Sequence, residues 1–277
     1  MLADYHSKWI KPSRACLLVV GDTTLAELKP LLEQKLAGWK PGDVPERKFP
    51  PAQPIEKPVV YLLDRPQAMQ SVIQVAIAAP PTANPNEIAI QAMNDFLGGT
   101  FTSRINMNLR EDKHWSYGAR TRMRDAQGPR AFVVNAPVQT DKTKESLLEI
   151  KRELLDVIGS RPGTQAELDQ VKAQQTLSLS GSWETNSAIL GSLSQIVQYS
   201  LPDDFWTTYA GKVRALTTDE VNAAAKAIVD PRRCVWIVVG DRAKIEQGVR
   251  EAGIGDVIVI DADGNKLGAS PSASSGS

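Results

Sequence analysis

Residues 97–123 read LGGTFTSRINMNLREDKHWSYGARTRM, and this stretch decides which fold the chain can be assigned to. Its middle part predicts a helix over 100–112 that ends near Arg110, and its last part predicts a strand over 116–123 that begins near Tyr117. A cation at a helix C-terminus and a tyrosine in a strand are both favourable on structural grounds alone. Both side chains are also hydrogen-bond donors, which could bind a carbonyl or an oxyanion if the helix end and the strand start converge.

The segments around this stretch predict an α+β fold. A helix over 84–99 has Pro85 in its first turn and ends at Gly98 and Gly99, which are typical of a helix C-terminus. Strands come before it, a hairpin and several helices follow, and a strand–helix–strand segment closes the unit. This order predicts helices packed on a mostly antiparallel or mixed sheet. The expected strands are 59–66, 70–80, 116–123, 130–140, 231–240 and 256–261, and the expected later helices are 140–158, 164–180, 182–200, 202–216 and 217–230.

An internal repeat indicates that the chain holds parts of two related units. PSRACLLVVGDTTLAELKPLLEQ at 12–34 is similar to PRRCVWIVVGDRAKIEQGVRE at 231–251, and both read as an apolar strand, Val-Val-Gly-Asp and a helix. We therefore expect residues 1–45 to be the C-terminal remnant of a first domain. A proline-rich linker over 46–58, a complete second domain over 59–262 and a disordered tail over 263–277 follow.

Composition excludes several classes of function. The 277 residues carry 32 basic and 32 acidic side chains, so no net field favours nucleic acid, and no apolar run is long enough to insert into a membrane. The only histidines are His6 and His114, and neither H-x-x-E-H nor any other zinc motif is present, so no metal site is expected in this chain. No G-x-S-x-G elbow or phosphate-binding loop occurs. The two cysteines, Cys16 and Cys234, are expected to be buried, unpaired thiols.

Several motifs in order resemble the second-domain signature of the insulinase-like (pitrilysin-type) zinc peptidases, whose zinc motif is inverted and which include mitochondrial processing peptidase. That signature is Leu-Gly-Gly, Ser-Arg, Leu-Arg-Glu and Tyr-Gly, matched here by 97–99, 103–104, 109–111 and 117–118. QTDKT, SLPDDFW, TTDEV and VVGD also match in order. The resemblance covers about residues 5–262 and implies a two-layer, processing-peptidase-like metallohydrolase domain preceded by the truncated end of its duplicate.

What the resemblance implies is half of an active site. In the family, one unit binds zinc, which activates the water that attacks a peptide carbonyl, and the other supplies an arginine–tyrosine pair. By position that pair is Arg110 and Tyr117, which would bind substrate and stabilise the oxyanion, while Gly98 and Gly99 would let the substrate backbone approach closely. The expected partners are a peptide or unfolded polypeptide and a zinc-motif-bearing domain or subunit, because the chain itself lacks the zinc motif.

Three explanations stay open at this point. The chain is either a fragment of a single-chain peptidase, as the position of Met1 inside a unit favours, or a separate subunit that completes a zinc-bearing partner. The third is a non-catalytic structural or binding subunit of a processing-peptidase-like complex, against which the Arg110–Tyr117 pair argues. Alone, the chain is expected to be inactive. Its compartment, periplasmic or cytoplasmic, stays open as well.

Overall fold

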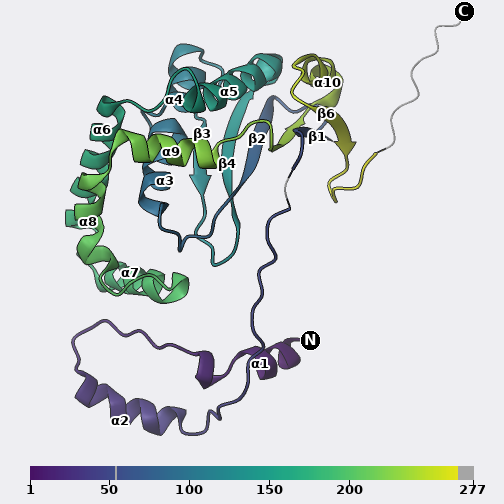
Figure 1. Ribbon diagram of the computed structural model, residues 1–277. Helices are drawn as coiled ribbons and strands as arrows, with labels where there is room; N and C mark the ends of the chain where they lie inside the picture. The colour runs from purple at the N-terminus through teal and green to yellow at the C-terminus, as the bar shows by residue number, and fades with distance from the viewer. Residues whose placement is uncertain (54, 268–277) are drawn as a thin grey trace, which may run out of the picture. The chain divides into compact units, whose positions relative to one another are not determined.

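The computed structural model describes residues 1–53 and 55–267, which divide into two units. One unit comprises 1–50 and 174–211, and the other comprises 51–173 and 212–277. The second unit holds the sheet and all residues of the predicted site (Figure 1). The expected tail, 263–277, falls mostly on residues outside those described, although residues 263–267 belong to a turn in which Lys266 bridges back to Ile260.

A six-stranded mixed sheet forms the centre of the larger unit, with strand order β3-β4-β2-β5-β1-β6. The neighbours β3–β4, β4–β2 and β2–β5 are antiparallel, whereas β1 is parallel to both β5 and β6. This confirms the predicted α+β class with a mixed sheet. The strands are β1 (Val59–Asp64), β2 (Gln70–Ala79), β3 (Arg120–Met123), β4 (Arg130–Gln139), β5 (Val235–Gly240) and β6 (Asp256–Ile260).

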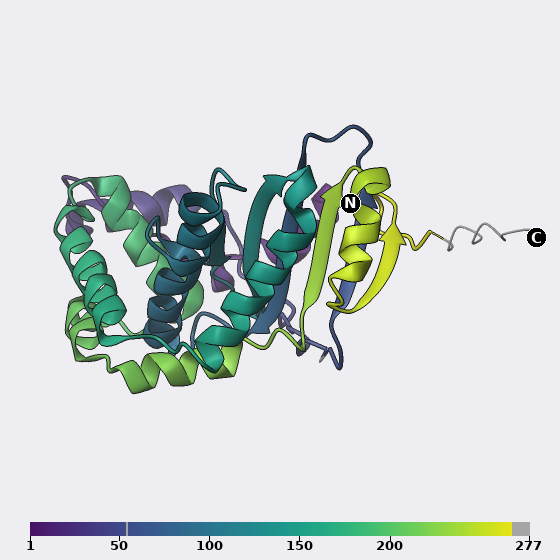
Figure 2. The ribbon, with the colours of Figure 1, turned by 90° about the horizontal axis from the view of Figure 1, so that it is seen from above.

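Helices cover one face of this sheet. Ile73, Val75 and Ile77 recur at period two in the sequence, which predicts a strand with one apolar face, and all three are buried in β2. The apolar spacing of Leu147, Ile150, Leu154 and Val157 likewise predicts the buried stripe of a helix, and all four are buried in α5. Figure 2 shows α5 and α10 on the same side of the sheet. The helical elements of this unit are α3 (Glu87–Asn94), η2 (Asp95–Gly99), α4 (Arg104–Asn106), η3 (Met107–Asp112), η4 (Thr140–Lys142), α5 (Thr143–Ile158), α9 (Thr218–Ile228) and α10 (Arg242–Glu251).

The other face of the sheet has side chains that are only partly covered. Because residues paired across neighbouring strands point to the same face, the register defines rows of side chains on it. One row is Arg120, Asn135, Gln74, Ile237, Tyr61 and Ile258. The next is Arg122, Val133, Ala76, Val235, Val59 and Asp256. We call these twelve residues the open face; Arg120, Arg122 and Asp256 are exposed and the rest are of intermediate burial.

The smaller unit contains helices and no strand among its described residues. Its elements are α1 (Leu2–Trp9), η1 (Pro12–Arg14), α2 (Leu25–Leu36), η5 (Ser178–Gly181) and α7 (Asn186–Tyr199); α6 (Gln165–Leu177) and α8 (Phe205–Ala215) cross the boundary between the units. The first copy of the internal repeat therefore lacks the strand that its sequence predicts. Residues 15–20 pair with no strand, and Leu17 and Val19 are 59% and 47% exposed.

The second copy explains why the first forms no strand. There, β5 lies between β1 and β2, and Gly240 packs so closely that a Cβ on it would lie 2.7 Å from Ser71 Oγ. The equivalent Gly21 has no atom within 4 Å of such a Cβ. A strand requires a partner strand for its backbone groups, and the first copy has none. For the same reason Cys16, predicted to be buried, is exposed, whereas Cys234 is buried as predicted.

The start of α5 also differs from the prediction. The sequence predicts a helix over 140–158, for which Thr140 or Asp141 would be a suitable N-cap, but a 3₁₀ turn occupies Thr140–Lys142 and α5 begins at Thr143. The Thr143 hydroxyl lies 2.7 Å from Ser71 Oγ, in a buried hydrogen bond that ties the first turn of the helix to β2. Tertiary contact therefore sets this boundary.

Candidate functional site

The predicted pair lies on one continuous, folded-back segment. Arg110 is in η3, a π-helical turn, and Tyr117 is in the loop that leads to β3. The loop reverses direction at His114, which has φ 58° and whose Nδ1 lies 3.1 Å from the Arg110 carbonyl oxygen. The amides of Trp115 and Ser116 then both donate to the Leu109 carbonyl, at 2.9 and 3.2 Å.

This geometry brings the two predicted residues near one anchor, the Leu109 carbonyl that accepts both hydrogen bonds. Arg110 directly follows Leu109, and Tyr117 directly follows Ser116, so each is one residue from a backbone hydrogen bond that joins the two segments. The side chains themselves form no hydrogen bond with each other among the residues that the structure describes. The structure therefore brings the backbones of the pair together, and neither side chain is bonded to the other.

Side chains of neighbouring elements hold the loop in place. Gln139, at the end of β4, donates its backbone amide to the Trp115 carbonyl (2.9 Å) and its side-chain amide to the His114 carbonyl (3.0 Å). The Ser116 hydroxyl donates to the Pro137 carbonyl (2.5 Å). Asn106, which sequence reasoning missed, is buried and accepts from the Ala119 amide at 3.0 Å. An asparagine inside a predicted helix, where it is a weak helix former, was the available signal.

These contacts also correct the position of the third strand. The sequence predicted a strand from residue 116, but β3 begins at Arg120. Ser116 and Ala119 are bound by Leu109 and Asn106, so their amides are not available to a strand partner. The result is that Tyr117 lies in an anchored loop instead of a sheet.

Tyr117 is the exposed side chain of this loop. Its side chain is 88% exposed, and among the described residues it makes no hydrogen bond or ring contact. A single exposed apolar residue is ordinary on a protein surface. An exposed phenol on a loop held by the hydrogen bonds described above is a different case, since the fold fixes its backbone while the side chain faces solvent.

Arg110 is more restrained than Tyr117. Its guanidinium carbon lies 4.5 Å from the Phe101 ring centroid, and its Nε is 3.3 Å from Glu111 Oε1. The side chain is 39% exposed. Stacking on an aromatic ring fixes the plane of a guanidinium without using its hydrogen-bond donors. Most of its five donors thus remain free for a ligand.

The two glycines are explained largely by packing. A Cβ on Gly98 would lie 2.5 Å from Thr121 Cγ2 and 2.8 Å from the Thr121 amide nitrogen, so only glycine lets η2 pack this closely on β3. Gly98 is buried, whereas Gly99 is exposed. A Cβ on Gly99 would meet the side chains of Asn94 and Asp95 at 2.6 and 2.8 Å.

The Ser-Arg motif is likewise structural. Arg104 forms a bidentate ion pair with Glu167, with Nε–Oε1 and Nη2–Oε2 distances of 2.6 Å, and its side chain is 8% exposed. Arg104 also donates to the carbonyls of Arg161 and Pro162. Glu167 closes the predicted capping box with Thr164 at the start of α6. Burial raises the pKa of Glu167, but hydrogen bonds from Arg104 and Thr164 outweigh it, and the pKa lies below its usual value.

The described residues include no side-chain cluster suited to a metal ion and no helix suited to a membrane. Across the described part of the chain, no group of three or more His, Cys, Asp or Glu side chains is placed to hold a metal ion. His114 is an exposed turn residue, as predicted, and His6 is exposed in α1. These residues do not fit a catalytic zinc. None of the described helices combines the length and apolarity needed to cross a membrane.

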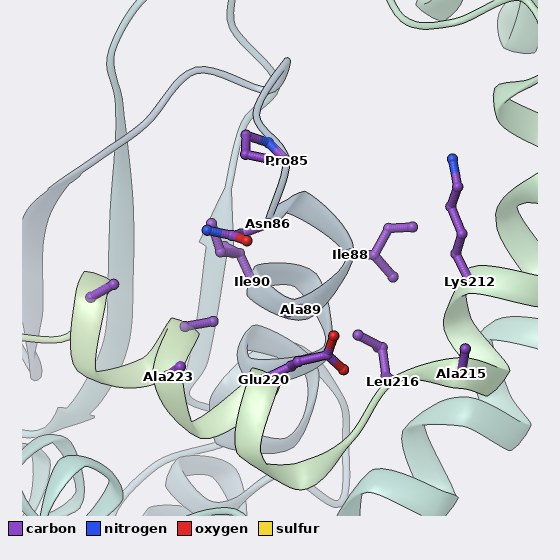
Figure 3. A pocket seen from close by; sticks show the side chains of 12 residues that line it. Pro85, Asn86, Ile88, Ala89, Ile90, Lys212, Ala215, Leu216, Glu220 and Ala223 are labelled. Atoms are coloured by element: carbon purple, nitrogen blue, oxygen red, sulfur yellow. The ribbon is translucent and has the colours of Figure 1, made fainter.

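A pocket of about 570 Å³ lies between α3, the end of α8 and α9, and none of the predicted site residues lines it (Figure 3). Its walls are mainly small or apolar side chains, such as Ile88 and Leu216. Its carboxylate, Glu220, is committed to a capping box with Thr217. Lys212 also lines the pocket, whereas none of Gly98, Gly99, Arg110 and Tyr117 does.

The comparisons place this fold in a family. Residues 1–175 match the family described as "Peptidase M16 inactive domain", so the chain belongs to that family and is of the C-terminal, insulinase-like type that the motifs resembled. Among proteins with curated descriptions, none matches this sequence.

Solved structures share the fold at low identity. A peptidase M16 inactive domain from Pseudomonas fluorescens has a TM-score of 0.71 and 22% identity, with 79% of this chain and 52% of that chain covered. A protease from Helicobacter pylori gives 0.76 and 20%, with 86% and 58% covered. A chain of Complex III2 from Candida albicans gives 0.64 and 15%, with 84% and 57% covered. The present chain thus spans a little over half the length of these proteins.

Proposed function

We propose that this chain is the substrate-binding, zinc-less half of a zinc metallopeptidase that cleaves peptides or unfolded polypeptides. Arg110 and Tyr117 bind the substrate and stabilise the oxyanion of the peptide carbonyl. The observation that carries the proposal is the folded-back loop. It holds two motif residues next to one anchor and leaves the side chain of Tyr117 88% exposed.

The division of tasks among the motif residues supports this proposal. Leu109 is buried, Gly98 packs on β3 and Arg104 pairs with Glu167, so these three serve the fold. Arg110 and Tyr117 remain as donors without a full set of partners. A guanidinium and a phenol positioned before the reaction are suited to an oxyanion, because donors that need no reorganisation stabilise developing charge best. In this proposal the substrate backbone passes close to Gly99, which is exposed, while the buried Gly98 packs on β3 and holds the turn in place.

Hydrolysis requires the zinc-motif-bearing half, which is expected to supply the metal that activates water. We propose that residues 15–20 contribute a strand to the sheet of that half. The exposed Leu17 and Val19 and the empty space around Gly21 support this, because the equivalent residues of the second copy are packed within a sheet. The same segment would explain the remnant domain expected over 1–45 and the linker over 46–58.

Reconstitution tests the proposal. The purified chain is incubated with zinc and a quenched fluorescent peptide, alone and with a homologue that carries the H-x-x-E-H motif. Cleavage is expected only in the mixture, and Arg110→Ala should lower its turnover. Arg214→Ala, a change of an exposed arginine in α8, is the control for charge and should leave turnover unchanged. Cleavage by the chain alone, or equal turnover with Arg110→Ala, would refute the assignment.

The second candidate is a structural or binding subunit without catalysis. The likeness of the fold to a chain of Complex III2 from Candida albicans favours it. In that case the chain would bind the zinc-motif homologue, and neither Arg110→Ala nor Tyr117→Phe would alter the activity of the mixture.

A further inference from the structure

The edge strand β3 carries a row of arginines without acidic partners. Arg120 and Arg122 lie on the open face, Arg124 follows directly after the strand, and all three are exposed. None of them forms an ion pair with any described residue. We call Arg120, Arg122 and Arg124 the arginine row. The chain as a whole is neutral, so this is a local concentration of positive charge.

β3 is also at the end of the sheet. It pairs with β4 on one side, and no described strand pairs with it on the other (Figure 1). An unpaired edge presents backbone donors and acceptors that an extended segment can use. Strong positive charge on an edge strand also prevents indiscriminate pairing with other apolar edges.

We propose that the arginine row binds an extended polypeptide segment with acidic side chains at alternate positions, which adds to the sheet beside β3. This inference rests on the proposed function, because it specifies the class of substrate that the chain would hold. The added segment would direct every second side chain to the open face, where its carboxylates would lie opposite Arg120 and Arg122. Arg124 would extend the same row beyond the strand.

The geometry of the neighbouring strands supports this choice of ligand. The open-face row that begins with Arg122 continues into Val133, Ala76 and Val235, and it reaches an acid only at Asp256 on the opposite edge. Asp256 is already paired with Lys57, with Nζ–Oδ2 at 2.7 Å. The two edges of the open face therefore differ in charge, and only the β3 edge offers unneutralised charge, which is positive.

The test measures binding of synthetic peptides to the full chain by fluorescence anisotropy. The probe is a labelled Thr-Val-Asp-Val-Asp-Val-Thr, and its matched neutral version carries Asn in place of both Asp residues. Two exposed opposite-charge pairs across strands should make the acidic peptide bind about 2- to 30-fold more tightly than the neutral one. The difference should shrink at high salt, because exposed pairs are screened.

Two double variants separate the arginine row from general charge. Arg120→Gln/Arg122→Gln should abolish the preference for the acidic peptide, while Arg65→Gln/Arg214→Gln removes the same charge from two exposed sites elsewhere and should preserve it. Arg120→Lys/Arg122→Lys should retain most of the preference. An acidic peptide with N-methyl groups on alternate amides should bind more weakly if the segment pairs with the β3 backbone.

The outcomes distinguish this inference from the proposed function. Equal binding of the acidic and neutral peptides, or equal losses in the two Gln double variants, would overturn the arginine row as a binding surface. If the neutral peptide still binds and the reconstituted mixture still cleaves it, the proposed function stands without this inference. If no peptide binds to the chain or to the mixture, both are overturned.

Discussion

Replacing Gly98 by alanine tests whether this glycine serves the fold or the substrate. In the structure, an added Cβ would lie 2.5 Å from Thr121 Cγ2, 2.6 Å from Thr121 Oγ1 and 2.8 Å from the Thr121 amide nitrogen. Favourable contacts between such atoms begin near 3.5 Å, so the shortfall approaches 1 Å. A rotation of the Thr121 side chain can relieve two of these contacts, but the third involves backbone and requires η2 to move from β3.

The expected cost follows from this geometry. Overpacking in a tightly packed region destabilises by about 1–3 kcal/mol, and the helix-propensity gain of alanine over glycine, about 0.8–1 kcal/mol, offsets part of it. We predict a net loss for Gly98→Ala, measured as a lower urea midpoint by circular dichroism. Gly191→Ala in α7, where a Cβ would meet nothing within 4 Å, should instead leave the midpoint unchanged or raise it.

A double-mutant cycle makes the reasoning specific. Thr121→Ala removes the two side-chain atoms, so Gly98→Ala should cost less in that background, although the backbone contact keeps part of the penalty. The reasoning would be refuted if Gly98→Ala were as stable as the native chain, or if the two changes were simply additive. If the stable Gly98→Ala variant also failed to bind peptide, Gly98 would be a substrate residue and not a packing residue.

Three further predictions concern pairs and thiols that the fold has positioned. The pKa of Glu167 is lowered in the folded state, so its pairing with Arg104 stabilises the fold at pH values above the ordinary glutamate pKa, and this stabilisation is lost as the pH falls through the folded pKa. Glu167→Gln should therefore lower the urea midpoint at pH 6. A difference from the native chain that is as large at pH 3 as at pH 6 would argue against this role of the ion pair. Burial raises the pKa of the Cys234 thiol to about 12, whereas Cys16 is exposed. Iodoacetamide at pH 8 should therefore alkylate Cys16 of the folded chain and spare Cys234, which mass spectrometry of the labelled chain would measure. Rapid labelling of both thiols would contradict the burial of Cys234. Arg130 is a nearly buried guanidinium with acidic partners, so Arg130→Ala should destabilise by about 3–5 kcal/mol in urea titration, and a loss below 1 kcal/mol would mean that the ion pair is not formed.

Local patterns predicted much of the fold. The period-two spacing of Ile73, Val75 and Ile77 identified β2 and its buried face, because alternation maps directly onto a strand. Thr217 and Glu220 have capping-box spacing in the sequence, which predicts a helix start there, and α9 begins with both reciprocal hydrogen bonds present. Such features depend on residues three or two apart, so the sequence contains all the information that they need.

The features that the sequence did not predict depend on distant residues. Ser116 resembles a strand residue, but a hydrogen bond to Leu109 keeps it out of the sheet. The apolar segment 15–20 has the composition of a strand but pairs with no strand among the described residues.

The candidate site was only partly predictable, because it too depends on contacts between distant residues. The motif located Arg110 and Tyr117, but it could not separate residues that serve the fold from residues that are free to bind. That separation needed the packing of Gly98 on Thr121 and the ion pair of Arg104. Burial and partners, which the sequence does not specify residue by residue, leave Tyr117 88% exposed.

The turnover number of the reconstituted mixture with Tyr117→Phe tests the central claim most directly. This change removes one hydroxyl from a side chain that is 88% exposed, so stability should stay within about 0.5 kcal/mol of the native value. Loss of one oxyanion donor predicts a fall in kcat of about 100- to 1,000-fold, corresponding to about 2.7–4 kcal/mol. Tyr5→Phe, at a second exposed tyrosine, should leave kcat unchanged. A native kcat for Tyr117→Phe in a mixture that cleaves the peptide would contradict the assignment of Tyr117 to the active site.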